Sequence, residues 1–570
     1  MASTITAGDR KTSWSVRSHS RAGLVSGGLA RVARVTAPTA AAAAIFVVAI
    51  AYRAYAIATT VPALGADESV IGIMAQQILA GTHFPAFFLR QHYMGSIEAY
   101  LAAPWVAVLG PTAAALRAGT LALYAVFYWG MYWTTRRLYH PWFAVLVAAA
   151  LAFGSDRLLR QQLQANGGHE EILAIGAVLA GVTYVLCRPN PPARRLWWYA
   201  AWGLLVGLGL WSGPLFATTA LPMAVTLLIF RWRDVIRWPA LAAIAGALVG
   251  ALPMIVHNVG LPAGVGTVHD IFAYSPEAPA GVSLRQHLHG TRLAIAYATG
   301  MCDRDCRGWQ LDWSKISFPL LLLAGISIIC VGLWRSVRRP DADPEARARY
   351  AVQLAIAAGA VATVALYLQS IHSIALDNVV WNNARYLNSL TLATPVLLWP
   401  CWRLCTAARG RVRLAPVAAL VGSAVLGLNV LAATSASASA VGTGGAVERA
   451  QQARHEALSA YLTEHRIDRL YSDYITCVPL IYTSEAKILC AAVEPGLRRG
   501  YDRWIPFRQQ VDEAPEQYFA FLTGSSLDDD LRAYLAEYRT PAYTTEVAGY
   551  TIYRLTARVD LPVPGYWVDP

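Results

Sequence analysis

The sequence predicts an α-helical polytopic membrane protein with about 11 transmembrane helices, followed by a small C-terminal soluble domain of α/β or α+β type. Of the 570 residues, 56% are hydrophobic and 14% are charged, whereas soluble domains carry roughly 25% charged residues. Several windows of roughly 17 to 22 residues contain almost no charge, which is the length that crosses a hydrocarbon core. Basic residues gather between these windows, so the net charge of +12 indicates the positive-inside pattern rather than a nucleic-acid partner.

Residues 1–36 are polar and rich in Arg, Ser and Gly. The apolar segment that follows them is too long for the hydrophobic region of an ordinary signal peptide. A segment of this composition buries too little apolar surface to fold by itself. We therefore expect a disordered cytoplasmic tail.

The transmembrane domain is predicted to occupy residues 37–434, and basic clusters follow every second apolar window. This alternation places the N-terminus in the cytoplasm, and an odd number of spans then places the C-terminal domain on the extracytoplasmic side. The Arg- and Ala-rich composition favours a bacterial plasma (inner) membrane. The predicted spans are 38–60, 113–135, 141–158, 170–187, 197–212, 215–230, 238–256, 316–334, 351–370, 388–404 and 414–434.

The first outer loop, residues 61–112, is too apolar for an ordinary solvated loop. Two stretches, beginning at Ser69 and Met94, have the length and broken periodicity of helices that lie in the membrane interface. We expect this loop to belong to the membrane architecture.

A linker of small residues is predicted at 435–446, and an extracytoplasmic soluble domain at 447–570. The domain combines polar segments of helical spacing with short runs rich in β-branched and aromatic residues. Its predicted elements are a helix over 447–466, strands beginning at Arg469, Lys487 and Tyr550, and a helix beginning at Val478.

Four cysteines fall on the predicted outer side, where an oxidising compartment would permit disulfides. Cys302 could pair with Cys306, and Cys477 with Cys490. The alternative for each pair is free thiols. His287 and His289 near the first pair leave a metal site as a further alternative.

Two acidic clusters begin helices on the predicted outer side. Asp67 and Glu68 follow the first span, and His169, Glu170 and Glu171 follow two glycines before the fourth span. Acids in a first helical turn are stabilising by themselves, so a purely structural role is the alternative for both clusters.

A third cluster, Arg385 and Tyr386, begins the tenth predicted span. The arginine could merely extend toward lipid headgroups, but its planar guanidinium also suits bidentate binding of a phosphate. Together the three clusters indicate group transfer from a lipid-linked phosphate. A carboxylate would deprotonate an acceptor hydroxyl, and the arginine would stabilise the departing phosphate.

Four segments resemble polytopic GT-C glycosyltransferases, in the branch of the protein O-mannosyltransferases and lipid A aminoarabinose transferases. The resemblance covers roughly residues 38 to 405. The segments are ADESVIGIMAQQIL from Ala66, LRQHYMGSIEAYLAAPWVAVLG from Leu89 with Arg117 after it, TRRLY from Thr135, and ARYLNSLTLATP from Ala384. Where the family often carries a Lys-Pro-Pro-Leu type segment, this chain has Gln91-His-Tyr-Met-Gly-Ser96.

The resemblance implies roles for individual residues. Asp67 would be the catalytic acid/base, with Glu68 beside it, and Arg385 would contact the phosphate of a polyprenyl-phosphate sugar. The remaining implied residues are Tyr386, Arg90 and His92 near the donor phosphate, and His169, Glu170 and Glu171 along the site.

These observations lead to one functional hypothesis, an inverting transfer of a sugar from a polyprenyl-phosphate donor to a hydroxyl of a glycan, lipid or protein. The absence of a P-loop or dinucleotide fingerprint fits a donor without a nucleotide, and a divalent metal is optional. The alternatives are a secondary transporter, a glycan ligase or polymerase that uses a diphosphate-linked donor, and a non-catalytic scaffold.

Overall fold

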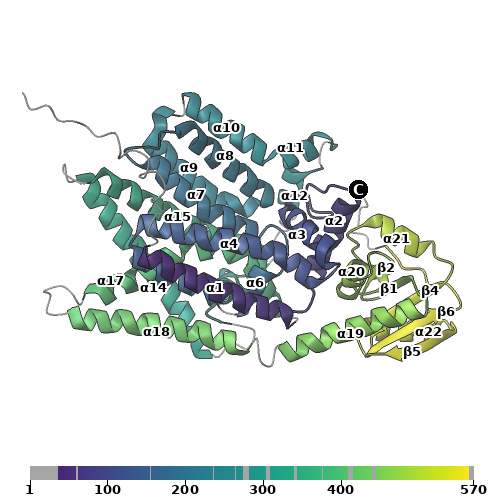
Figure 1. The fold of residues 1–570 in the computed structure, drawn as a ribbon. Coiled ribbons are helices and arrows are strands. Elements are labelled where there is room, and N and C mark those ends of the chain that lie inside the picture. Colours follow the sequence, from purple (N-terminus) through teal and green to yellow (C-terminus); the bar gives the residue numbers. More distant parts are fainter. Residues whose placement is uncertain are drawn as a thin grey trace, which may run out of the picture.

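The protein consists of a bundle of helices joined to a domain that contains a β-sheet (Figure 1). The computed structural model describes residues 36–59, 62–154, 156–234, 236–262, 265–273, 281–302, 308–338, 343–374, 377–407, 415–439 and 445–563. Apart from residue 36, the tail predicted at 1–36 lies outside the described residues.

The bundle is formed by helices that pack around α7, which is almost entirely buried along its length. An apolar helix without a polar face is stable where neighbouring helices surround it. The helices of this part are α1 (Ala37–Ala58), α2 (Ala66–Ala80), α3 (Ile97–Leu109), α4 (Ala113–Leu138), α5 (Pro141–Ala152), α6 (Asp156–Leu163), α7 (Glu170–Cys187), α8 (Arg195–Ser212), η1 (Pro214–Phe216), α9 (Ala217–Arg231), η2 (Trp232–Asp234), α10 (Trp238–Gly250), α11 (Leu252–Val259), α12 (Thr267–Ala273), α13 (Leu284–Ala298), α14 (Gly308–Arg338), α15 (Pro344–Gln369), η3 (Ile371–Ser373), α16 (Asp377–Asn383), η4 (Ala384–Ala393), α17 (Thr394–Ala407) and α18 (Ala415–Ser439).

Small residues let α8 and α10 approach each other closely. A Cβ atom at Gly203 would lie 1.8 Å from the carbonyl oxygen of Ala243, and one at Gly246 would lie 2.1 Å from that of Ala200. Close backbone contact of this kind is how helices associate in lipid, where apolar side chains gain little by leaving the bilayer.

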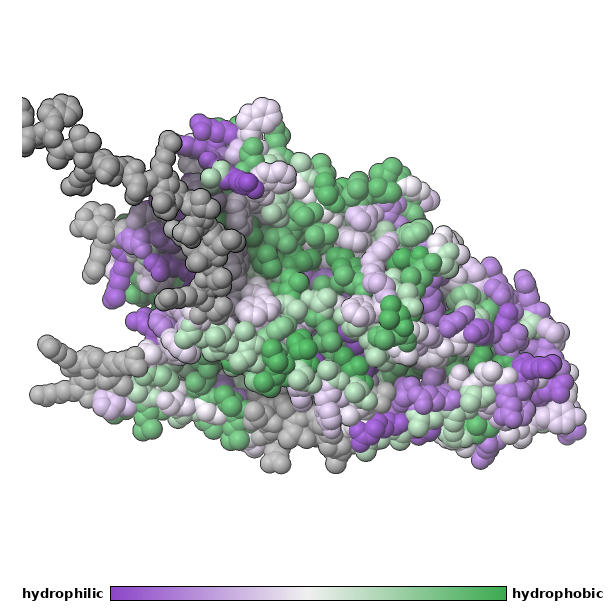
Figure 2. All heavy atoms as spheres, in the orientation of Figure 1, coloured by the Kyte–Doolittle hydropathy of each residue, from purple (hydrophilic) through white to green (hydrophobic). Residues whose placement is uncertain are grey.

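The helical part exposes many large apolar side chains, for example Leu248, Val249 and Leu323. Figure 2 shows this hydrophobic surface over the middle of the bundle, with hydrophilic surface over the C-terminal domain and at the opposite end. Such a surface is unfavourable in water and is expected in contact with lipid. The chain is thus a multi-pass integral membrane protein, as predicted.

The predicted number of about 11 spans is not confirmed. Within the described ranges, 5 helices are long and apolar enough to cross a membrane, and 7 if each bent pair is one span. The bent pairs are Pro141–Ala152 with Arg157–Leu163, at 83°, and Trp238–Gly250 with Leu252–Val259, at 65°. The span predicted at 388–404 begins instead in the 3-10 segment η4 before it continues as α17. Sequence windows record apolarity, and they do not record such breaks.

The first outer loop contains the two predicted helices, α2 and α3, which pack on each other and on the start of α4. They share one hydrophobic core with helix α20 (Tyr474–Thr483) and strands β1 (Arg469–Ser472) and β2 (Leu489–Glu494) of the C-terminal domain. Gly72 of α2 makes room for the ring of Tyr482, because a Cβ atom there would lie 2.4 Å from that ring. The soluble domain is therefore docked on the interfacial helices.

The C-terminal domain is of the α/β type, which is one of the two predicted alternatives, α/β and α+β. Its sheet has the strand order β3-β2-β1-β4-β6-β5, in which β1 runs parallel to β2 and β4. The remaining pairs are antiparallel. Its elements are α19 (Gly445–Glu464), β1 (Arg469–Ser472), α20 (Tyr474–Thr483), β2 (Leu489–Glu494), β3 (Arg498–Arg499), α21 (Ile505–Asp512), β4 (Gln517–Leu522), α22 (Ser526–Glu537), β5 (Ala542–Val547) and β6 (Tyr550–Leu555).

The connection between the two parts differs from the predicted linker at 435–446. Helix α18 continues to Ser439 and α19 already begins at Gly445. Small residues such as Ala and Ser continue a helix readily once neighbouring helices support it.

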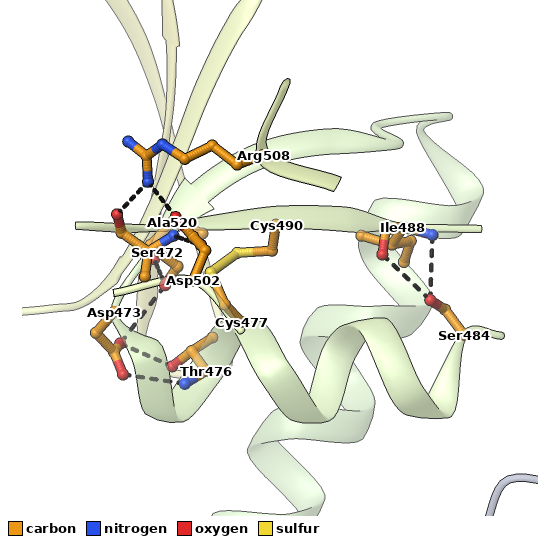
Figure 3. The surroundings of a disulfide bond; sticks show 11 residues. Ser472, Asp473, Thr476, Cys477, Ser484, Ile488, Cys490, Asp502, Arg508 and Ala520 are labelled. Carbon is orange, nitrogen blue, oxygen red and sulfur yellow. Dashed lines mark hydrogen bonds and ion pairs between the residues drawn. A yellow bond between two sulfur atoms is a disulfide. The ribbon is translucent and has the colours of Figure 1, made fainter. Parts of the chain in front are cut away.

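A disulfide between Cys477 and Cys490 joins α20 to β2, with 4.9 Å between the two Cα atoms (Figure 3). The nearby Asp473 caps α20 by accepting a hydrogen bond from the Thr476 amide at 3.0 Å. Both features fix the start of α20. Of the other predicted pair, Cys302 is buried, and Cys306 lies outside the described residues.

Candidate active site

Asp67 lies at the start of α2, where its carboxylate faces side chains from two distant parts of the chain. Its Oδ2 lies 3.4 Å from Nη1 of Arg385 in η4. Its Oδ1 accepts a hydrogen bond from the Tyr474 hydroxyl at 3.3 Å and lies 3.6 Å from Nη2 of Arg503. The structure thus brings Asp67 and Arg385 together, and it adds Tyr474 and Arg503 of the C-terminal domain, neither of which was among the predicted site residues.

Glu68 occupies a different environment from its neighbour. Both of its carboxylate oxygens bind the Arg117 guanidinium, with Oε1 at 2.9 Å from Nε and Oε2 at 3.0 Å from Nη2. Both side chains are fully buried. The bidentate pair joins α2 to α4, and Glu68, expected beside Asp67 in the site, does not line the polar cavity beside Asp67.

A polar cavity of about 330 Å³ opens beside Asp67. Its lining includes Arg385 and two arginines of α6, Arg157 and Arg160. Arg157 lies over the ring of Trp381 at 4.8 Å, and Arg160 forms an ion pair with Glu448 of α19. We name this space the basic cavity. Guanidinium groups gathered around a cavity suit a phosphate, which they can bind bidentately.

A second cavity, of about 420 Å³, lies on the side of η4 that Tyr386 faces. Tyr386 stacks on His372 with 4.4 Å between ring centroids, and His169 meets it edge-on at 6.0 Å. Burial lowers the pKa of His169 to about 3, and Arg385 and Arg157 contribute in the same direction. His169 is therefore neutral at physiological pH. Tyr386, expected at the donor phosphate, lines this aromatic cavity instead.

A third cavity, of about 450 Å³, lies on the opposite face of α6 and is lined mostly by apolar side chains such as Phe153, Leu158, Leu398 and Val430. Helix α6 separates it from the basic cavity, because Leu158 faces the apolar side while Arg157 and Arg160 face the polar side. We name it the apolar cavity.

Arg90 and His92, both expected near the phosphate, lie outside the basic cavity. The Arg90 side chain donates to the carbonyl oxygen of Asp502 at 3.1 Å and lies 4.9 Å from the Tyr501 ring. The His92 amide donates to Asp270 at 3.1 Å. Arg90 is thus occupied in docking the soluble domain, which a local sequence segment could not reveal.

Glu170 and Glu171 were expected to line the site, but they are buried in the bundle next to Glu98 and face none of these cavities. Glu98 accepts from the Gly167 amide at 2.8 Å, and burial together with Glu171 raises its pKa well above the ordinary value. Of this cluster, His169 alone lines a cavity.

A metal site would need a cluster of His, Cys, Asp or Glu side chains as ligands. In the part of the chain that the structure describes, no group of three or more His, Cys, Asp and Glu side chains is placed to bind one ion.

Part of the site could have been found in the sequence. The short helix α6 carries Arg157, Leu158, Arg160 and Gln161, and its polar and apolar residues alternate with helical spacing. Tyr474 and Arg503 had no comparable signal, because their position depends on how the soluble domain docks.

The fold is similar to that of solved membrane transferases. ArnT from Cupriavidus metallidurans bound to undecaprenyl phosphate matches with a TM-score of 0.55 and 14% identity over 90% of this chain and 98% of that chain. The apo state of that protein gives a TM-score of 0.48 at 15% identity over 91% of this chain and 98% of that chain. The Archaeoglobus fulgidus oligosaccharyltransferase in its apo form gives 0.45 at 12% identity over 92% and 75% of the two chains.

The likeness to ArnT confirms the GT-C type of fold that the sequence segments indicated. The other two matches are too weak to carry an argument. No protein-family model matches the chain, and no curated relative matches it either.

Proposed function

We propose that this protein is a membrane glycosyltransferase that moves a sugar from a polyprenyl-phosphate donor to a hydroxyl acceptor. The observation that carries the proposal is the pairing of Asp67 with Arg385, which are 318 residues apart in sequence and lie beside the basic cavity. Asp67 would supply the base, and Arg385 would supply the cation that binds a phosphate. Transfer from a phosphate leaving group requires both.

The two cavities beside α6 support the class of donor. The basic cavity suits a phosphate, and the apolar cavity on the other face of the same helix suits a hydrocarbon chain. A polyprenyl phosphate has both parts in one molecule. The ArnT structure of similar fold has undecaprenyl phosphate bound.

The proposed reaction is a single displacement. The acceptor oxygen attacks the anomeric carbon, and Asp67 takes the proton of the acceptor hydroxyl. The bond between the anomeric carbon and the phosphate oxygen breaks, and the phosphate leaves with the electron pair. Arg385, with Arg157 and Arg160, stabilises the charge on the departing phosphate. One displacement inverts the anomeric configuration.

The test is a comparison of Asp67→Asn with the exposed control Asp560→Asn. Purified protein in nanodiscs is given undecaprenyl-phosphate glucose, mannose or arabinose with octyl glycosides as acceptors. Release of undecaprenyl phosphate is the measurement. We expect Asp67→Asn to bind undecaprenyl phosphate at least as tightly as the unchanged chain and to lose at least about 100-fold in turnover, which is the usual range for a general base.

Other outcomes separate the alternatives. Full activity of Asp67→Asn would contradict the role of Asp67. Turnover of diphosphate-linked donors alone would indicate a ligase or polymerase, and movement of an intact donor across the bilayer of proteoliposomes would indicate a transporter. Binding without any turnover would favour a scaffold.

A further inference from the structure

The C-terminal domain holds the segment from Tyr501 to Trp504 against the membrane part. In Tyr501-Asp-Arg-Trp504, Asp502 is anchored inside the domain, where its Oδ1 accepts from the Ala492 amide at 2.8 Å and its Oδ2 binds the buried Arg508 at 2.6 Å. The two neighbouring side chains consequently extend the other way. Tyr501 donates to the Arg90 carbonyl at 3.2 Å, and Arg503 donates to the Leu89 carbonyl at 3.4 Å.

Arg503 continues from this anchor toward Asp67. Its Nε donates to the Tyr474 hydroxyl at 2.9 Å, and its Nη2 lies 3.6 Å from Asp67 Oδ1. The side chain is 12% exposed. A charged group so well shielded interacts with its neighbours more strongly than a surface arginine does.

Tyr474 is fixed independently of Arg503. It is the first residue of α20, which is capped by Asp473 and joined to β2 by the disulfide (Figure 3). Burial raises the pKa of its hydroxyl, so the group stays protonated. It accepts from Arg503 and donates to Asp67 Oδ1.

We propose that Tyr474 and Arg503 of the soluble domain are positioning residues that hold Asp67 Oδ1 and so direct Oδ2 toward the acceptor hydroxyl. This inference rests on the proposed function. Arg385 binds Oδ2 in the present structure, and a donor phosphate would draw that guanidinium to itself. The two groups of the soluble domain then remain as the partners that keep the carboxylate oriented and offset its negative charge beside the phosphate.

A double-mutant cycle tests whether Arg503 acts through Asp67. The affinity for undecaprenyl phosphate in nanodiscs is measured for Arg503→Gln, for Asp67→Asn and for the double variant. We expect Arg503→Gln to weaken binding about tenfold by itself, because the Asp67 charge then repels the phosphate more strongly. In the Asp67→Asn background the same change should cost less than about threefold. Arg503→Lys, which keeps the charge, should restore most of the affinity.

Kinetics test the role of Tyr474. Tyr474→Phe should lower kcat about tenfold and leave both KM for the donor and the affinity for undecaprenyl phosphate within about twofold, because a neutral donor is lost. Matched controls are the exposed Arg498→Gln and Tyr543→Phe, which should behave as the unchanged chain.

The outcomes are distinguishable. Equal losses from Arg503→Gln in both backgrounds, or an unchanged kcat in Tyr474→Phe, would overturn the inference while the proposed function stands. If the unchanged chain neither binds undecaprenyl phosphate nor releases it from the donors, the proposed function itself fails.

Discussion

Asp67 and Glu68 are adjacent acids with different surroundings, and the difference assigns their roles. Asp67 is 32% exposed beside the basic cavity, with its partners 3.3 to 3.6 Å away. Glu68 is fully buried, and Arg117 occupies both of its oxygens. Asp67 can therefore be reached from the cavity, whereas Glu68 is enclosed by its bidentate partner.

Breaking the buried pair should be costly. Glu68→Gln leaves the Arg117 cation without a charged partner, so we expect a loss of about 3–5 kcal/mol in the free energy of unfolding. Replacing both residues, in Glu68→Leu with Arg117→Met, should cost less than the single change, because no charge then remains buried. Thermal unfolding in detergent measures the effect, with the exposed Glu546→Gln as the control. A single variant as stable as the control would contradict the anchoring role.

At the level of elements, α6 is a short helix whose two faces meet chemically different cavities. Its arginines line the basic cavity, and Leu158 lines the apolar cavity. The span predicted at 141–158 ends inside this segment, and its remaining residues were expected in an outer loop. The sharp bend after α5 turns it across the bundle instead.

Because the two faces of α6 line different cavities, substitutions on each face should affect a different end of a lipid ligand. Arg157→Gln should weaken undecaprenyl phosphate and geranyl phosphate alike, by about tenfold, because both carry the phosphate. Leu158→Asn should weaken undecaprenyl phosphate more than geranyl phosphate, because only the longer chain fills the apolar cavity. The affinities are measured in nanodiscs. Equal effects of Leu158→Asn on both ligands would show that the apolar cavity does not hold the chain.

At the level of the whole molecule, the candidate active site is shared between two parts of the chain. Besides Tyr474 and Arg503, the soluble domain is held by Gln76, which donates to the Tyr482 carbonyl at 2.9 Å, and by Tyr482, which donates to the Thr112 carbonyl at 3.1 Å. Gln76 lies on α2, the helix that carries Asp67, and Thr112 immediately precedes α4. Docking and the geometry of the site are therefore coupled.

This coupling predicts that a change at the docking surface lowers activity without touching the cavity. Gly72→Val would force the Tyr482 ring out of its place on α2. We expect faster proteolysis of the soluble domain and a loss of turnover of about tenfold or more. Gly427→Val is the matched control, since nothing described lies within 4 Å of a Cβ atom there. Normal turnover with an undocked domain would contradict the coupling.

The sequence by itself determined the membrane class, the two interfacial helices and several elements of the soluble domain, because local composition and periodicity are what sequence windows measure. It also predicted Asp67 and Arg385 as site residues. The tertiary structure decided the roles of Glu68 and Arg90, the burial of Glu170 and Glu171, and the addition of Tyr474 and Arg503. These depend on contacts between segments that are separated in sequence, from Glu68 with Arg117 at a separation of 49 to Asp67 with Tyr474 at a separation of 407, and packing rather than local pattern selects them.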